Sequence, residues 1–298
     1  MLKPAIRFLW RNLPFKLPVL RPIRSIETPP HRLYQHLHFA GDFEVEIEPG
    51  ASFLIRSYGN YVENDLFWAG YHGNFERVSL HLWGELARDA ETVLDVGANT
   101  GVFALSAAAI NPDARVTAFE PVPRVVEKLR ANVALNGGRI AVESVAVSDR
   151  EGTARLCDTD SAHVYSASLG QAMLGDEYTR SYDVPTVSLD DFCAANEIER
   201  VDLVKIDVER HEPSVIRGFR KMISAHRPTL VVEILDAGIL SAVMAELDGV
   251  DYEVFDLANL GSVPGIPAPV PGHAERNYLF CTADVAERLG LVSGAGRA

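Results

Sequence analysis

The fold of this chain is decided by one stretch of its sequence, Leu94-Asp95-Val96-Gly97-Ala98-Asn99-Thr100-Gly101-Val102-Phe103. An apolar run ends at Asp95, a turn with two glycines follows, and a helical pattern begins near Gly101. Gly97 allows the chain to turn sharply, and Gly101 allows a close approach of backbone or ligand. Backbone N–H groups at the start of the helix favour an anionic group. The stretch therefore predicts a strand–turn–helix unit with a ligand beside its turn.

Beyond this stretch, short apolar runs alternate with amphipathic segments of helix length. The expected strands are rich in β-branched residues and cover 92–96, 116–119, 140–147, 203–208 and 230–234. The expected helices cover 101–110, 123–136, 213–224 and 238–247. Two late strands, at 252–257 and 278–282, are joined by a Gly/Pro-rich loop and are expected to form an antiparallel hairpin at the sheet edge. The alternation predicts an α/β fold with a doubly wound, mostly parallel sheet.

Two segments precede this alternating region. Residues 33–90 contain an alternating apolar–acidic run, a Pro-Gly turn, a second strand pattern and a helical pattern over 74–88, which together predict a small strand-rich cap. Residues 1–32 hold seven Lys or Arg and one Glu and are interrupted by prolines. We therefore divide the chain into a basic arm (1–32), a cap (33–90) and a main domain (91–298).

The composition excludes several classes of protein. With 47% hydrophobic and 23% charged residues, the chain is typical of a globular protein rather than a disordered one. The net charge of −13 argues against nucleic acid as a partner, because the phosphates repel an acidic protein. The three cysteines, Cys157, Cys193 and Cys281, form no CxxC pair, and no apolar run reaches the roughly 18–20 residues of a membrane span. These features favour a reduced, cytoplasmic setting.

The expected ligand at the turn is an adenosine compound. Glu120 lies 19 residues beyond Gly101 at the end of the next strand, where a carboxylate can accept both hydroxyls of a ribose. The nicotinamide pattern G-x-G-x-x-G is not met, since Asn99 and Val102 stand where its later glycines would be. S-adenosylmethionine has no pyrophosphate to bind and fits the looser pattern, with Asp95 facing its cationic end. The alternative is that the glycines only tighten the turn and that Glu120 is a solvated strand end.

Several blocks of the chain resemble one known family. In order along the sequence they are DVGANTGVFALSAA, AFEPVP, VAVSD, VSLDDF, DLVKIDVERHEPSVIRG and NYLF, within residues 91–283. They resemble the FkbM family of S-adenosylmethionine-dependent methyltransferases. The resemblance implies a class I, Rossmann-like methyltransferase fold of seven strands with the last antiparallel. It also implies O-methylation of hydroxyl groups on sugars or polyketide-type natural products.

The resemblance also assigns residues to the cofactor. Those expected in the cofactor turn are Asp95, Gly97, Asn99 and Gly101. Glu120 is expected to hold the ribose, and Ala146 and Val147 to flank the adenine.

The reacting end is expected after the strand at 203–208. Methyl transfer to an alcohol needs a group that takes its proton, and His211 is the first choice of base, with Asp207 orienting the acceptor or the cofactor's amino group. Alternatively, His211 only lies beside a helix start. A Mg²⁺ ion held by Asp207, Glu209 and Glu233 is a further, less favoured possibility.

Two features around the expected acceptor site are open to interpretation. Arg210 stands where the family usually has glycine. Either the arginine is strained, or the loop differs from that of the family, or Arg210 projects into the pocket and recognises an anionic acceptor. The polar segment 158–183 is expected to be a long loop over the acceptor, joined by Asn64, Phe67 and Trp68 from the cap. The alternative is an ordinary surface loop and a packed cap.

The leading hypothesis is an O-methyltransferase that acts on a hydroxyl of a small molecule or glycan. N-methylation, a non-catalytic nucleotide-binding module and a nicotinamide-linked oxidoreductase are the alternatives. The nucleic-acid amino-methyltransferase motif (N/D)PPY is not met, because residues 206–209 read Ile-Asp-Val-Glu. The basic arm is either poorly ordered or a peripheral attachment to an anionic membrane or partner. The oligomeric state is left open.

Overall fold

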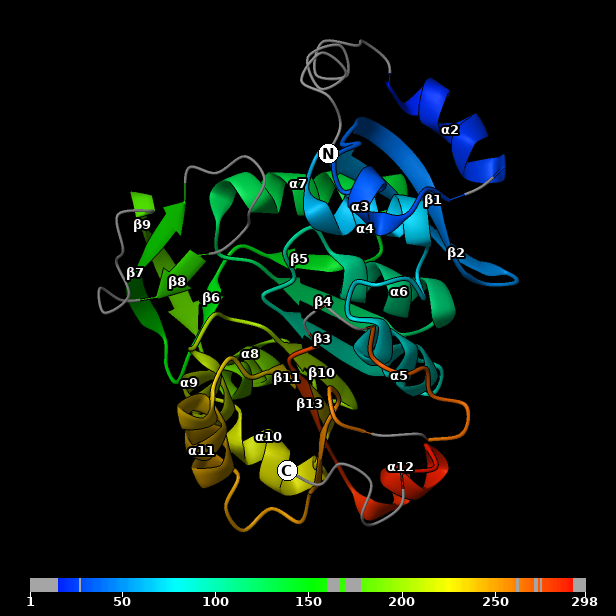
Figure 1. Ribbon diagram of the computed structural model, residues 1–298. Helices are drawn as coiled ribbons and strands as arrows, with labels where there is room; N and C mark the ends of the chain where they lie inside the picture. Colours follow the sequence, from blue (N-terminus) through cyan, green and yellow to red (C-terminus); the bar gives the residue numbers. More distant parts are fainter. Residues whose placement is uncertain are drawn as a thin grey trace.

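A seven-stranded sheet forms the centre of the molecule (Figure 1). The computed structural model describes residues 16–26, 28–159, 167–169, 178–260, 263–270, 273 and 275–291. Across the sheet the strands follow the order β12 (Glu253–Asp256), β13 (Asn277–Cys281), β11 (Thr229–Glu233), β10 (Leu203–Ile206), β3 (Thr92–Val96), β4 (Arg115–Phe119) and β5 (Ala141–Glu143). Neighbouring strands run parallel except at β13, which is antiparallel to both β11 and β12. This arrangement confirms the predicted doubly wound sheet with an antiparallel last strand, the class I methyltransferase fold.

Helices cover both faces of the sheet, because successive residues of each buried strand point to opposite sides. Val93 and Leu203 belong to one core, together with side chains of α5 (Arg77–Ala87), α6 (Val102–Ile110), α7 (Pro123–Leu135) and α12 (Ala283–Arg288). Leu94 and Val204 belong to a second core, together with side chains of α8 (Leu189–Ala195), α9 (Glu212–Arg217), α10 (Arg220–His226) and α11 (Ala237–Glu246). The carboxyl ends of the parallel strands are thereby left as the open edge of the fold.

Two predicted elements are divided in the structure. The strand expected at 140–147 becomes β5 and β6 (Ala146–Val147), because β6 leaves the central sheet and pairs with another strand. The helix expected at 213–224 becomes α9 and α10. The division falls at Gly218, where an added Cβ would lie 2.1 Å from the backbone oxygen of Ser148. This close approach, which hydrophobic periodicity does not reveal, coincides with the end of α9.

A second sheet stands beside the first and corrects the expected loop at 158–183. Its strands follow the order β6, β9 (Tyr178–Val187), β7 (Gly152–Thr159) and β8 (Ala167–Leu169). Positions 158–159, 167–169 and 178–183 are therefore strand, whereas 160–166 and 170–177 lie outside the described residues. Its apolar core is small, with Leu156 and Val184 among its members, so the segment has few of the apolar residues that indicate a strand.

The basic arm contains α2 (Lys16–Ile26), and α3 (His31–Tyr34) joins it to the cap. The cap contains β1 (Ala40–Glu48), β2 (Ala51–Tyr58), α4 (Tyr61–Ala69) and α5. The two strands predicted on either side of the Pro-Gly turn are confirmed, and they pair antiparallel as a hairpin. Two side chains at the C-terminal end of α7 bind strand β2: Asn132 Oδ1 accepts the N–H of Arg56 at 2.9 Å, and Oδ1 of the C-cap residue Asn136 accepts the N–H of Leu54 at 2.8 Å. The sequence pattern did not indicate α4. The cap shares the core of α6, which brings it against the open edge of the sheet.

The helices are short, and α7 has 13 residues. Within the described ranges, no helix combines the length and the apolar character that crossing a membrane requires. The three cysteines are buried and free.

Candidate functional site

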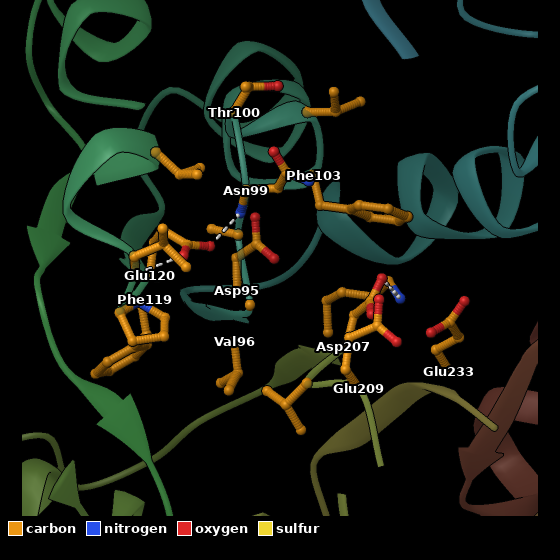
Figure 2. A pocket seen from close by; sticks show the side chains of 18 of the residues that line it. Asp95, Val96, Asn99, Thr100, Phe103, Phe119, Glu120, Asp207, Glu209 and Glu233 are labelled. Atoms are coloured by element: carbon orange, nitrogen blue, oxygen red, sulfur yellow. Dashed lines mark hydrogen bonds and ion pairs between the residues drawn. The ribbon is translucent and has the colours of Figure 1, made fainter. Parts of the chain in front are cut away.

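A cavity of about 270 Å³ opens at the carboxyl ends of β3, β4, β10 and β11 (Figure 2). It is lined by most of the residues predicted to bind the cofactor, namely Asp95, Gly97, Asn99, Glu120, Ala146, Val147 and Asp207. Three cap residues, Val62, Phe75 and Glu76, complete its wall. Two predicted residues, Gly101 and His211, do not line it. The fold thus brings the turn after β3, the end of β4 and the end of β10 to one cavity.

The turn after β3 is held by backbone contacts on both sides. The N–H groups of Gly97 and Ala98 donate to the carbonyl oxygen of Phe119, at 3.0 and 2.9 Å. Gly97 has a φ of +82°, and an added Cβ would lie 1.7 Å from the carbonyl oxygen of Asp207. The sharp turn expected at Gly97 is therefore present. At Gly101, with a φ of +97°, the added Cβ would instead meet Leu129 Cδ1 at 2.6 Å, so its close neighbour is α7 rather than the cavity.

Glu120 is fixed at the cavity wall and is only 6% exposed. Its Oε2 accepts the N–H of Asn99 at 3.0 Å, and its Oε1 accepts the N–H of Val122 at 2.9 Å. Burial raises the pKa of Glu120 to about 7. A carboxylate offers about four lone-pair sites, so each oxygen can accept a further hydrogen bond. Glu120 is therefore an oriented acceptor at the cavity and not a solvated strand end.

Asp95 joins the strand to the helix that follows the turn. Its Oδ2 accepts the N–H of Ala104 at 2.9 Å in the first turn of α6. The side chain is 1% exposed, and burial raises its pKa to about 7. Figure 2 shows Asp95 between Glu120 on one side and Asp207 on the other. When the Asp95 carboxyl is ionised, its negative charge therefore lies between those of Glu120 and Asp207 at the cavity wall.

A buried lysine organises the other side of the cavity. Lys205 is 1% exposed, its Nζ donates to Asn277 Oδ1 at 2.8 Å, and it lies 3.5 Å from Asp207 Oδ2. Burial alone would lower the pKa of Lys205, but the carboxylates around it, Asp207 first among them, raise it. Burial and the charge of Asp207 raise the pKa of Glu233 to about 9, and burial raises that of Glu76 to about 7. The surrounding carboxylates therefore favour the charged form of Lys205, and burial favours the neutral form of Glu233.

The sequence prediction missed Lys205, Glu76 and Asn277. The available signal was a lysine inside the apolar run Leu203-Val204-Lys205-Ile206, because a buried lysine needs carboxylate or amide partners. No local signal marks Glu76, which belongs to the cap and hydrogen-bonds to Asn277 Nδ2 through Oε2 at 2.9 Å.

Residues 95–254 match the family described as "Methyltransferase FkbM domain". The chain belongs to this family. It is a family of S-adenosylmethionine-dependent methyltransferases, so the resemblance seen in the sequence is confirmed.

Two named methyltransferases are similar in sequence to parts of this chain. The 31-O-demethyl-FK506 methyltransferase FkbM of Streptomyces tacrolimicus is 30% identical over 193 residues, which are 56% of this chain and 74% of the relative. The 2-O-methyltransferase NoeI of Sinorhizobium fredii is 30% identical over 153 residues, covering 48% of this chain and 63% of the relative. A crystal structure of methyltransferase FkbM from Methylobacillus flagellatus aligns with a TM-score of 0.43 at 18% identity, over 64% of this chain and 44% of that chain.

The histidine predicted as the base of this FkbM protein lies away from the cavity. His211 Nε2 is 2.9 Å from Ser148 Oγ, in the N-cap position of α9, and burial lowers its pKa. Of the two residues predicted to be catalytic, the fold brings Asp207 to the cavity and leaves His211 outside its lining. The geometry therefore agrees with the alternative position of His211 beside a helix start.

Arg210 has the left-handed backbone that the family's usual glycine at this position suggests. Its φ is +77°, and that of Glu209 before it is +51°, so two successive non-glycine residues occupy a region that costs energy. The Glu212 side chain accepts the N–H of Arg210 at 3.0 Å, which holds the loop. The guanidinium pairs with Asp236 and does not line the cavity. The alternative that Arg210 projects into the pocket is therefore corrected.

The cap residues expected at the acceptor are part of the cap core instead. Phe67 and Trp68 are 1% and 2% exposed, and Asn64 Nδ2 donates to the backbone oxygen of Tyr34 at 2.8 Å. None of the three lines the cavity, and their burial agrees with the alternative of a packed cap. Among the described residues, no three His, Cys, Asp or Glu side chains are grouped as a metal site would require.

Proposed function

We propose that the protein transfers a methyl group from S-adenosylmethionine to a hydroxyl group of a sugar or a polyketide-type natural product. One observation carries the proposal: Glu120 and Asp207 line one cavity from the ends of β4 and β10 (Figure 2). The printed names of the two relatives, a 2-O-methyltransferase and a 31-O-demethyl-FK506 methyltransferase, support oxygen as the acceptor atom.

The residues of the cavity fit the cofactor. The two free lone pairs of Glu120 match the ribose diol, and the apolar residues Ala146 and Val147 suit the adenine. Asn99 Oδ1 is buried without a hydrogen-bond partner among the described residues, and so offers an acceptor to a bound molecule. Asp95 contributes negative charge near a cationic group. The cofactor, when bound, supplies an electrophilic methyl group on its sulfonium.

Asp207 is the residue that we assign to the acceptor hydroxyl. Its side chain is 30% exposed, and Lys205 Nζ lies 3.5 Å from its Oδ2. Burial and the charge of Asp207 favour the neutral form of Glu233, which can then donate a hydrogen bond to the Asp207 carboxylate. Asp207 accepts the hydroxyl's hydrogen bond, aims an oxygen lone pair along the line of transfer and takes the proton as the new bond forms. Such positioning supplies much of the rate in a displacement reaction.

Calorimetric titration of S-adenosylmethionine and S-adenosylhomocysteine tests the cofactor assignment. We expect Glu120→Gln to weaken both roughly tenfold to hundredfold, because charge-assisted hydrogen bonds contribute about 1.5–3 kcal/mol each. Glu127→Gln on the exposed side of α7 is the matched control and should bind as the wild type does. Thermal unfolding of each variant establishes that it is folded. Stabilisation by NAD alone, or an unchanged affinity in Glu120→Gln, would contradict the proposal.

Acceptor pairs that share one ring and differ in a hydroxyl or an amino group test the reaction. Release of S-adenosylhomocysteine with the hydroxyl compound, and none with its amino counterpart, is the expected result. The reverse preference would identify an N-methyltransferase, and cofactor binding without release on any acceptor would favour a non-catalytic module.

A further inference from the structure

Helix α2 presents an apolar stripe that no other described part of the chain covers. Val19, Ile23 and Ile26 are 47%, 41% and 86% exposed. At about 100° per residue, these three and Pro22 fall within one sector of about 100° that contains no charged residue. A stripe of that width is what a helix normally buries. In Figure 1, α2 lies at the edge of the molecule, outside β1.

The opposite side of α2 is already packed, so the helix is docked and its exposed stripe faces away from the protein. Leu20 is 1% exposed in the main core, and Leu17 packs against the same core. The Arg24 guanidinium lies 5.0 Å from the ring centre of Phe67, and burial lowers its pKa. Arg21 Nη2 donates to the backbone oxygen of Asp42 at 3.1 Å, which fixes the helix to β1.

Basic and acidic residues are unevenly distributed along the chain, and α2 lies in its basic N-terminal part. Residues 1–32 carry seven basic and one acidic side chain, a net of +6, and none of the acidic residues precedes position 27. Residues 33–298 carry 21 basic and 40 acidic side chains, a net of −19. An anionic surface therefore attracts this end of the molecule and repels the rest, although salt screens the repulsion beyond about 8–10 Å.

We propose that α2 attaches the protein to the surface of an anionic lipid bilayer. Val19, Ile23 and Ile26 enter the boundary between headgroups and acyl chains, and the net positive charge of residues 1–32 attracts this end of the protein to the anionic headgroups. An apolar stripe combined with basic charge is the pattern of helices that lie in the membrane interface. A symmetric contact between two copies fits less well, because it places one basic helix against another.

Flotation of the full chain with vesicles tests the proposal. The vesicles contain phosphatidylcholine alone or with about a third of phosphatidylglycerol, at low and at high salt. We expect binding to the anionic vesicles only and weaker binding at high salt. Val19→Ser with Ile23→Ser should lower the partition coefficient about tenfold or more, because buried methylene groups contribute about 0.8 kcal/mol each.

Matched controls replace exposed apolar residues elsewhere on the molecule. Leu54→Ser on β2 and Met244→Ser on α11, which are 38% and 43% exposed in the wild type, should bind vesicles like the wild type. All variants should keep the wild-type affinity for S-adenosylhomocysteine, so this test is independent of the proposed reaction.

Three outcomes would overturn the proposal. They are absence of binding to anionic vesicles, equal binding by the Val19→Ser, Ile23→Ser variant, and equal loss of binding in the controls. Analytical ultracentrifugation without lipid distinguishes a second copy as the occupant: an oligomer that this double variant dissociates would assign the stripe to self-association instead.

Discussion

Replacing Gly97 by alanine tests whether backbone contact between two strand ends shapes the cavity. Gly97 has a φ of +82°, and an added Cβ would lie 1.7 Å from the carbonyl oxygen of Asp207 and 2.8 Å from its carbonyl carbon. Both are backbone atoms at the end of the neighbouring strand β10, and they cannot rotate away as a side chain would. The substitution must therefore separate the tips of β3 and β10.

Two contributions to the loss of stability add at this position. An L-residue with a left-handed backbone costs roughly 1–2 kcal/mol. Forcing an additional carbon into a packed region costs roughly 1–3 kcal/mol more. We expect Gly97→Ala to lower the free energy of unfolding by about 2–5 kcal/mol and the melting temperature by roughly 5–15 °C. Since Glu120 and Asp207 lie on opposite sides of the separated tips, affinity for S-adenosylhomocysteine should fall by at least about tenfold.

Gly137 offers a matched control for the backbone contribution. It also has a φ of +82°, but an added Cβ there would have no atom within 4 Å. Gly137→Ala should therefore lose only the roughly 1–2 kcal/mol of the backbone conformation and keep its cofactor affinity. Urea unfolding followed by circular dichroism measures the two free energies, and calorimetry measures the two affinities.

The difference between the two variants isolates the contact with Asp207. If Gly97→Ala and Gly137→Ala lose the same stability within about 0.5 kcal/mol, the strand tips are not in the contact that the structure shows. Wild-type affinity of a stably folded Gly97→Ala protein would likewise refute the link between this turn and the cofactor.

Three further predictions follow from the site. Asp207→Asn should lower turnover by roughly 10²–10⁴-fold, whereas His211→Ala should leave turnover within a few-fold of the wild type. Initial rates at saturating substrates measure both. A larger loss in His211→Ala than in Asp207→Asn would restore His211 as the base. Arg210→Gly should raise the melting temperature slightly, because it relieves about 1 kcal/mol of left-handed backbone strain and removes only an exposed ion pair with Asp236. A lower melting temperature would show that the ion pair contributes more than the strain costs. The cofactor-free protein should become less stable as the pH rises from about 5 to 8. Burial raises the pKa of Glu120 and of Asp95 to about 7, so in this range the folded state holds protons that the unfolded state has released. Urea unfolding across this range measures the slope, and a rising stability would contradict the assigned protonation.

Helices, strands and turns that form through local sequence patterns could be predicted from the sequence alone. The run at 92–96 is strand β3 at the predicted bounds, because its apolar residues are bracketed by a polar start and a glycine turn. Gly97 and Glu120 were found for the same reason: a sharp turn needs glycine, and a carboxylate at the end of the next strand reaches the same sheet edge. The hairpin β1–β2 and the antiparallel β13 also follow from alternation and from the absence of a connecting helix.

The residues around Asp207 are brought together by tertiary contacts that the sequence does not indicate. Lys205 is joined to Asn277, which is 72 positions away, and the cap supplies Glu76 to the same cluster. His211 and Asp207 are four positions apart, yet one lines the cavity and the other contacts Ser148, because the left-handed loop at 209–210 turns the chain between them. Spacing along the chain indicates which residues reach the sheet edge. Which of them face one another depends on contacts between distant segments, whose energies no local pattern contains.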